Sequence, residues 1–339
     1  MTHEFKDIVK EGIKAKENGV KSVLASVVAL DGSSYRRPGV RMLILENETM
    51  IGAVSGGCVE KEIILQSKSV FKSGESKIMT YDGRYRLGCE GVLYILIEPF
   101  NPNEAFKKSF FECLKKRQSF QLLSYYQKKE GINPKYGSVV KIENTTFQLN
   151  NLRNTESEIS LSVFKQKMPP CFKLLIVGAE HDAVKLCQFA ALTGWEVTIV
   201  SGASEAKSIS DFPGAHGFSA ISPEQMDVKL IDNQTAIVLM THNFANDLRY
   251  LVALKDTNPN YIGLLGPTKR REDLLSQFIE YCPNAEDDFL DKVHGPAGLN
   301  IGSETPQEIA ISIISEILCV IRKEEPISLS KKMGRIHTL

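Results

Sequence analysis

The chain has 339 residues, which at about 150 residues per domain suggests two domains. Its 41 basic and 41 acidic side chains cancel at pH 7, which argues against a protein that binds nucleic acid by neutralising phosphates. No apolar run approaches the roughly 20 residues needed to span a bilayer, and the charged start lacks the apolar core of a signal peptide. We expect a cytoplasmic protein that binds neither nucleic acid nor a membrane.

Seven cysteines are spread along the chain without a Cys-x-x-Cys pair. An odd number at such spacing is typical of reduced thiols and argues against a disulfide framework or a zinc ribbon.

The first half of the chain mixes helical and strand patterns. Apolar periodicity predicts a helix at 5–18, and two glycines introduce a second helix from residue 58 to about residue 70. Short apolar runs bounded by turn residues predict strands. The strands cover 22–29, 40–45, 50–54, 77–80 and 92–98, followed by a helix at 106–116 and strands at 120–126 and 138–149. We expect an N-terminal α/β domain of α+β type at 1–165, with 101–150 as a candidate appendage.

A polar stretch, 151–170, ends in two prolines and reads as a linker. Beyond it, short apolar strands alternate with helices, which is typical of a doubly wound parallel sheet. The strands are 173–177, 196–200, 235–240 and 261–264, and the helices 183–193, 246–254, 269–279 and 309–321. A capping box, Thr305-Pro306-Gln307-Glu308, marks the start of the last helix. We expect a Rossmann-like domain at 171–325 and a tail at 326–339.

Gly178 follows the first strand of the second domain, where dinucleotide-binding folds carry a Gly-x-Gly-x-x-Gly/Ala turn. Ala183 can replace the third glycine, but Glu180 occupies the second position, where the backbone normally approaches a pyrophosphate. Ser201 ends the next strand, where NAD-binding proteins usually carry an acidic residue. The pattern favours a Rossmann-like scaffold and disfavours NAD(P).

Gly56 and Gly57 precede Cys58 at the start of a predicted helix. Backbone N–H groups at a helix N-terminus favour anions, and a thiol there has a lowered pKa. Cys58 therefore suits a nucleophile or a soft-metal ligand. The alternative is a tight turn with a small buried cysteine.

Two loops add positive charge. Arg36 and Arg37 lie in the turn 31–39, and Arg86 precedes Cys89 in the loop between two predicted strands. Arginine can hold phosphate oxygens through two hydrogen bonds. A solvated loop is the plainer interpretation of each segment by itself.

The carboxyl ends of the second-domain strands are where doubly wound sheets bind ligands. His242 follows the third strand there, and Lys269 and Arg270 begin the helix after the fourth, where they can hold a phosphate. His242 can instead be a hydrogen-bonded capping or core histidine.

Six segments stand out by their order and spacing: 32–39, 52–60, 88–91, 240–243, 261–266 and 298–310. Together they resemble the XdhC/CoxI family, the xanthine dehydrogenase accessory factors. The resemblance covers nearly the whole chain apart from 101–170. The chain departs from the family at Glu180, Ser201 and Asn300.

The resemblance implies a maturation chaperone rather than an enzyme. Such a protein binds molybdopterin-type molybdenum cofactor and delivers it to an apo molybdenum hydroxylase related to xanthine dehydrogenase. The resemblance also implies self-association, with a dimer expected, and a cysteine desulfurase as a further partner. The candidate molybdenum ligands are Cys58 and Cys89. The candidate cofactor-binding set adds Gly56, Gly57, Arg36, Arg37, Arg86, Gly178, His242, Lys269 and Arg270.

Two other functions stay open. An NAD(P)- or nucleotide-binding oxidoreductase would use the Rossmann-like domain, and an assembly scaffold would bind only protein partners. The grouped cysteines that iron–sulfur clusters need are missing from the sequence, so we do not expect the chain to be a molybdenum hydroxylase itself.

Overall fold

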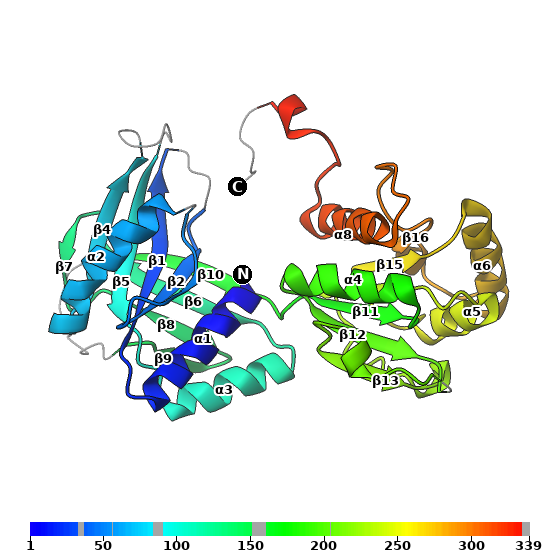
Figure 1. The fold of residues 1–339 in the computed structure, drawn as a ribbon, viewed down its shortest axis with the longest axis horizontal. Coiled ribbons are helices and arrows are strands. Elements are labelled where there is room, and N and C mark those ends of the chain that lie inside the picture. The colour runs from blue at the N-terminus through cyan, green and yellow to red at the C-terminus, as the bar shows by residue number, and fades with distance from the viewer. Residues whose placement is uncertain (33–36, 56, 84–90, 151–160, 204, 334–339) are drawn as a thin grey trace. The chain divides into compact units, whose positions relative to one another are not determined.

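The computed structural model describes residues 1–32, 37–55, 57–83, 91–150, 161–203 and 205–333. The chain forms two compact units, Met1–Pro170 and Cys171–Leu339 (Figure 1). Among the helices of these described ranges, none is long and apolar enough to cross a membrane.

The first unit is built on two antiparallel sheets. One sheet has six strands in the order β3-β2-β1-β5-β4-β7, and the other has four in the order β10-β6-β8-β9. The six-stranded sheet contains β1 (Ser22–Asp31), β2 (Arg41–Leu45), β3 (Met50–Gly52), β4 (Lys77–Asp82), β5 (Val92–Pro99) and β7 (Gly131–Ile132). The four-stranded sheet contains β6 (Phe120–Tyr126), β8 (Gly137–Ile142), β9 (Thr145–Gln148) and β10 (Ser162–Met168).

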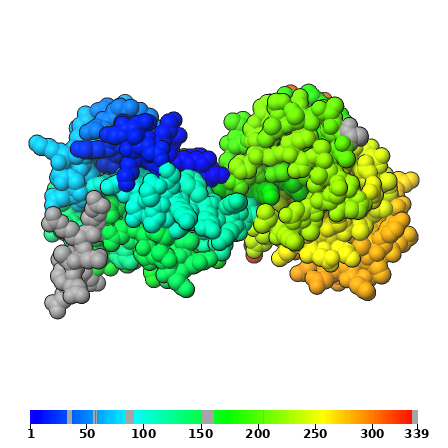
Figure 2. Space-filling view, turned by 90° about the horizontal axis from the view of Figure 1, so that it is seen from below, coloured from blue at the N-terminus to red at the C-terminus, as the bar shows by residue number. Residues whose placement is uncertain are grey.

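Three helices cover these sheets: α1 (Thr2–Glu17), α2 (Cys58–Ser73) and α3 (Glu104–Lys115). Alternate residues of a strand point to opposite faces, so Val23 packs with α2 whereas Leu24 packs with α1 and α3. Phe5 of α1 contacts Phe110 of α3, with 5.7 Å between ring centroids. Figure 2 shows the dark-blue N-terminal segment on the surface of this unit, beside cyan residues.

The stretch 101–150 shares a core with the rest of the unit. Phe120 and Val140 lie in one hydrophobic cluster with Leu24 of β1, so this part of the chain is integrated in the unit. The expected single strand at 138–149 is a hairpin, β8 and β9, whose turn places Glu143 at a φ of 50°.

The expected linker contains a strand. Residues 162–168 form β10, which pairs antiparallel with β6. Exposed Lys165 and Lys167 alternate with buried Gln166 and Met168 on this edge strand. Charged side chains are well tolerated on edge strands. The polar composition of 162–168 therefore suggested a linker where β10 forms.

The second unit is a doubly wound parallel sheet, as the sequence predicted. The strand order is β13-β12-β11-β14-β15-β16, and every pairing described is parallel. The bounds are β11 (Lys173–Val177), β12 (Glu196–Ser201), β13 (Gly217–Ala220), β14 (Thr235–Leu239), β15 (Tyr261–Leu264) and β16 (Val293–His294). Because the order reverses between β11 and β14, their carboxyl ends mark the switch point where such sheets bind ligands.

Helices lie on both faces of this sheet. Leu174 and Ile176 of β11 pack in the cluster of α4 and α8, whereas Leu175 and Val177 pack in the cluster of α5 and α6. The helices are α4 (His181–Leu192), α5 (Phe244–Ala253), α6 (Thr268–Tyr281), α7 (Asp287–Leu290) and α8 (Pro306–Arg322). The predicted capping box is confirmed, since Thr305 Oγ1 accepts from the Glu308 amide and Glu308 Oε2 from the Thr305 amide.

Candidate functional site

The turn before α2 is organised around the carboxylate of Glu60. Glu60 Oε1 accepts hydrogen bonds from the amides of Val54 (3.1 Å) and Ser55 (2.6 Å). Its Oε2 accepts from the Ser55 hydroxyl (2.5 Å) and the Gly57 amide (2.9 Å). Gly57, the N-cap residue, has a φ of 122°, which only glycine adopts without strain. The turn is therefore fixed immediately before Cys58, the first residue of α2.

The electrostatics of Glu60 follow from these contacts. Glu60 is only 6% exposed, and this burial opposes its ionisation. The hydrogen bonds from Ser55 and Gly57 outweigh burial, so the pKa of Glu60 lies below its ordinary value. The sequence predicted that backbone amides before this helix bind an anionic ligand. In the structure, amides of this turn donate instead to a negatively charged side chain of the protein itself.

The structure gives a partial view of the other predicted N-terminal site residues. Arg37 is exposed and has an interaction partner. The remaining four members lie outside the described residues: Arg36, Gly56, Arg86 and Cys89. Convergence of these groups on Cys58 stays a prediction.

Gly178 lies at the switch point of the second unit, where two strand ends come very close. Its φ is 132°, and a Cβ added to it would lie 2.3 Å from the carbonyl oxygen of Met240. No side chain fits between these backbones. The glycine is therefore required by the packing of the β11 turn against the β14 turn, whether or not a ligand binds there.

A cavity of about 380 Å³ opens beside this glycine, at the carboxyl ends of β11, β12 and β14. Two of its lining residues contact Lys207, whose Nζ donates to the Ala179 carbonyl oxygen and lies 3.8 Å from a carboxylate oxygen of Glu180. Glu180 and Lys207 thus lie together over the turn where a dinucleotide fold would hold its pyrophosphate.

The β14 and β15 turns are tied together by Asp247, which is 2% exposed. Its carboxylate accepts from the Thr241 hydroxyl at 2.7 Å and the Thr241 amide at 3.2 Å. It also pairs with Arg270 Nη2 at 2.6 Å. One face of the Arg270 guanidinium lies over the Phe244 ring, 5.5 Å from its centroid. Arg270 is therefore already held by a structural carboxylate.

His242 and Arg270 lie together around a second cavity, of about 220 Å³, at the same edge of the sheet. His242 is exposed and has a left-handed φ of 53°, so it is not a core histidine. Lys269 is exposed in the first turn of α6. The structure thus brings His242 and Arg270 into one place, next to the Gly178 turn.

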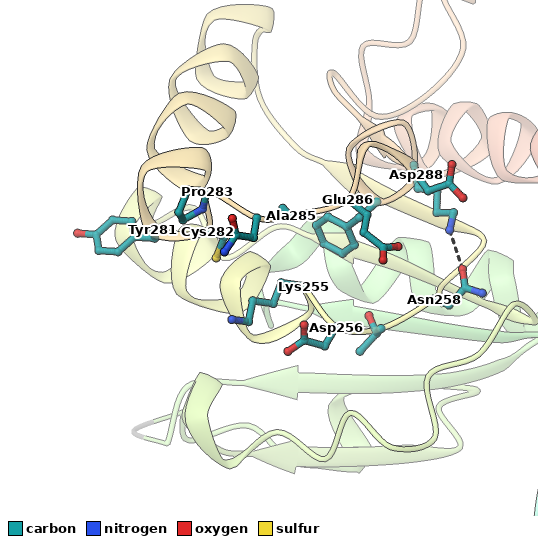
Figure 3. Close-up of a pocket in the computed structure, with 13 residues that line it drawn as sticks. Lys255, Asp256, Asn258, Tyr281, Cys282, Pro283, Ala285, Glu286 and Asp288 are labelled. Carbon is teal, nitrogen blue, oxygen red and sulfur yellow. Dashed lines mark hydrogen bonds between the residues drawn. The ribbon is translucent and has the colours of Figure 1, made fainter.

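The cavity in Figure 3, of about 680 Å³, lies at the opposite edge of the sheet. Asn258 precedes β15 and Lys292 precedes β16, so these residues mark the amino ends of the strands. Lys292 Nζ donates to Asn258 Oδ1 at 2.6 Å. Of the predicted site residues that the structure describes, none lines this cavity.

Three acidic residues of these sites were missed by the sequence reasoning. Glu60 could have been found as the acidic third residue of a helix opened by glycines. Asp247 gave no local signal, because its partners lie at the ends of other strands. Glu205, on the wall of the cavity beside Gly178, lies in a loop without a recognisable sequence pattern. Among the residues that the structure describes, no group of three histidine, cysteine, aspartate or glutamate side chains could hold a metal ion.

The two units define a class of protein in which an antiparallel two-sheet unit precedes a Rossmann unit. The comparisons agree with this architecture: residues 15–82 match the XdhC and CoxI family, and residues 174–317 match the XdhC Rossmann domain. The chain belongs to the XdhC and CoxI family, as its motifs predicted.

Two relatives align over most of the chain. One, from Bacillus subtilis (strain 168), is named as a probable xanthine dehydrogenase subunit; it is 28% identical over 338 residues, with 89% of this chain and 94% of the relative covered. The other is the "Molybdenum cofactor insertion chaperone PaoD" of Escherichia coli (strain K12), 23% identical over 330 residues, with 96% and 91% covered.

A solved structure supports the fold. A Bacillus halodurans protein described as a xanthine dehydrogenase superposes with a TM-score of 0.77 at 24% identity. The match covers 94% of this chain and 97% of that one.

Proposed function

We propose that this chain is an accessory protein that binds a molybdopterin-type cofactor and delivers it to an apo molybdenum hydroxylase. The observation that carries the proposal is the turn held by Glu60, which presents Cys58 at the start of α2. The turn occurs in a chain that aligns over 96% of its length with a molybdenum cofactor insertion chaperone.

The chemistry of the cargo suits this position. The cofactor carries a phosphate and a molybdenum centre, and a thiolate is a soft ligand for such a metal. Cys58 is the first residue of α2, and cysteines at helix N-termini are a common kind of thiolate ligand. Cys58, with Cys89 as a second candidate, would therefore contact the metal.

The phosphate of the cofactor needs a partner other than the backbone amides that the two glycines suggested. The amides of Val54, Ser55 and Gly57 are used by Glu60, so the phosphate contact falls to the arginines. The candidates are Arg36, Arg37 and Arg86. Guanidinium groups suit this role because they can donate two parallel hydrogen bonds to phosphate oxygens.

The recipient in this proposal is an apo hydroxylase related to xanthine dehydrogenase. The name of the Bacillus subtilis relative supports a connection with such an enzyme. Self-association as a dimer, a cytoplasmic location and the cysteine desulfurase partner are proposed from the family resemblance and the sequence.

The test is to co-express the chain with the cofactor pathway, purify it, and measure bound molybdenum and pterin. We expect both in the unaltered protein and a large loss of molybdenum in Cys58→Ala. Cys319→Ala is the control, because Cys319 lies half-buried on α8, in the other unit. Unchanged loading in Cys58→Ala and Cys89→Ala would remove the thiolate role.

A further inference from the structure

The wall of the cavity of about 380 Å³ beside Gly178 includes a buried hydroxyl for which the described residues provide no hydrogen-bond partner. Ser201 ends β12, lines this cavity and is only 2% exposed. Within the described residues, its Oγ makes no hydrogen bond. Buried polar groups are nearly always hydrogen-bonded, so an isolated one at a cavity wall points to a missing partner.

An acidic side chain lies on the wall of the same cavity. Glu205 lies in the loop that follows β12, and it lines the cavity with Ser201. A turn in which the Glu205 amide donates to the Gly202 carbonyl oxygen brings it there. One carboxylate oxygen, Oε1, accepts from the Lys207 amide at 3.2 Å. The end of β12 carries Ser201 in place of an acidic residue, and Glu205, four residues later, places a carboxylate at the same cavity.

Together these groups match the needs of a ribose. In doubly wound folds an acidic residue beyond the second strand accepts from the ribose hydroxyls. Ser201 and Glu205 offer a hydroxyl and a carboxylate on one wall. The volume lies within the range of about 300–1,000 Å³ found for small-molecule sites.

The neighbouring turn disfavours a pyrophosphate. Glu180 stands where a second glycine would let the backbone approach the phosphates, and Lys207 is engaged with Glu180 and the Ala179 carbonyl. Arg249, also on the cavity wall, is held by Glu224 through two hydrogen bonds of 2.6 and 3.0 Å. A ligand without a diphosphate avoids repulsion by Glu180 and leaves both ion pairs intact.

We propose that this cavity binds a ribonucleoside moiety, with Ser201 and Glu205 contacting the ribose hydroxyls and no pyrophosphate over the β11–α4 turn. This site is distinct from the Cys58 turn in the other unit. It does not depend on the proposed cofactor function.

Calorimetric titration of the full chain tests the site with four probes: adenosine, cytidine, 2′-deoxyadenosine and NAD⁺. We expect a ribonucleoside to bind, its 2′-deoxy form to bind about tenfold more weakly, and NAD⁺ to bind no better than adenosine. No heat from either ribonucleoside at millimolar concentration would overturn the proposal, as would equal affinity for adenosine and 2′-deoxyadenosine.

Two variants locate the site. Ser201→Ala and Glu205→Gln should each weaken binding about tenfold, whereas Glu286→Gln should not, because Glu286 lines the cavity at the opposite edge of the sheet. Glu205 lies in a loop, so the affinity of Glu205→Gln for the nucleoside tests the site even if Ser201→Ala destabilises the fold. Unchanged affinity in Glu205→Gln would contradict the assignment.

Discussion

The Glu60 carboxylate accepts the amide hydrogen of Gly57 at 2.9 Å, one residue before Cys58 begins α2. A helix N-terminus preceded by glycines ordinarily invites an anion from solution. Here the anion belongs to the helix itself. The turn is thereby shaped by the chain's own side chain, and the first residue of the helix has a defined backbone position.

Replacing Glu60 tests this arrangement. In Glu60→Gln, an NH₂ group replaces one oxygen and faces donors of the turn, so hydrogen bonds to a charged acceptor are lost. We expect the free energy of unfolding to fall by about 2 kcal/mol, measured by urea denaturation. Glu62→Gln is the matched control, since Glu62 lies on the same helix and accepts one side-chain hydrogen bond, from Gln66. Equal losses in the two variants would contradict the role of Glu60.

The sequence predicted much of the second unit and less of the first. Continuous apolar strands such as Lys173–Val177 and the capping box at Thr305 are local signals, and the structure confirms both. Strand β10 was not predicted, because its exposed lysines make the segment polar and obscure the alternation of buried and exposed residues. Strand β16 has only two residues, too few for a period to be recognised.

The candidate sites divide in the same way. Gly178 and Cys58 could be found because glycine turns before helices are local patterns. The contacts of Asp247 with Thr241 and Arg270 could not, because they join the ends of two different strands. The sequence spacing of the glycines and Cys58 also could not show that the amides before Cys58 donate hydrogen bonds to the Glu60 carboxylate.

A buried carboxyl of the first unit predicts the pH dependence of stability. Glu98 on β5 is fully buried and accepts from the Ser138 amide (2.8 Å) and Asn150 Nδ2 (2.9 Å). Burial raises its pKa from 4.5 to about 7. Between these pH values the folded chain holds a proton that the unfolded chain has released. Stability should therefore fall by about 3 kcal/mol as pH rises from 4.5 through 7.

Glu98→Gln isolates this contribution, because the amide keeps the shape and does not titrate. Urea denaturation at several pH values should show a flatter profile for Glu98→Gln between pH 5 and 8. Glu46→Gln, at an exposed turn, should keep the slope of the unaltered chain. An unchanged slope in Glu98→Gln would assign the pH dependence to other groups.

Gly178→Ala should be strongly destabilising. The added Cβ would meet the Met240 carbonyl oxygen at 2.3 Å, and the φ of 132° is strained for alanine. We expect a loss of about 3 kcal/mol in the free energy of unfolding. Gly202→Ala is the control in the same cavity wall, since nothing lies within 4 Å of its added Cβ. Similar denaturation midpoints for both variants would contradict the close approach of the two turns.

The Asp247–Arg270 pair should behave differently from a surface pair. Asp247→Asn leaves the Arg270 guanidinium without its carboxylate in a largely buried place, so we expect a loss of about 3 kcal/mol. The control is Glu224→Gln, which removes the partner of Arg249 at an exposed position. Thermal unfolding should show no resolved change for this control. An Asp247→Asn variant as stable as the control would contradict the structural role.

In the proposed function the chain carries a molybdenum cofactor and passes it on. The most direct measurement mixes the purified, loaded chain with an apo molybdenum hydroxylase, separates the two proteins, and determines the molybdenum on each. We expect molybdenum to move to the hydroxylase, and we expect Cys58→Ala, which carries little molybdenum, to transfer little. Molybdenum that stays on the chain, or a Cys58→Ala variant that loads and transfers as the unaltered protein does, would contradict the proposed function.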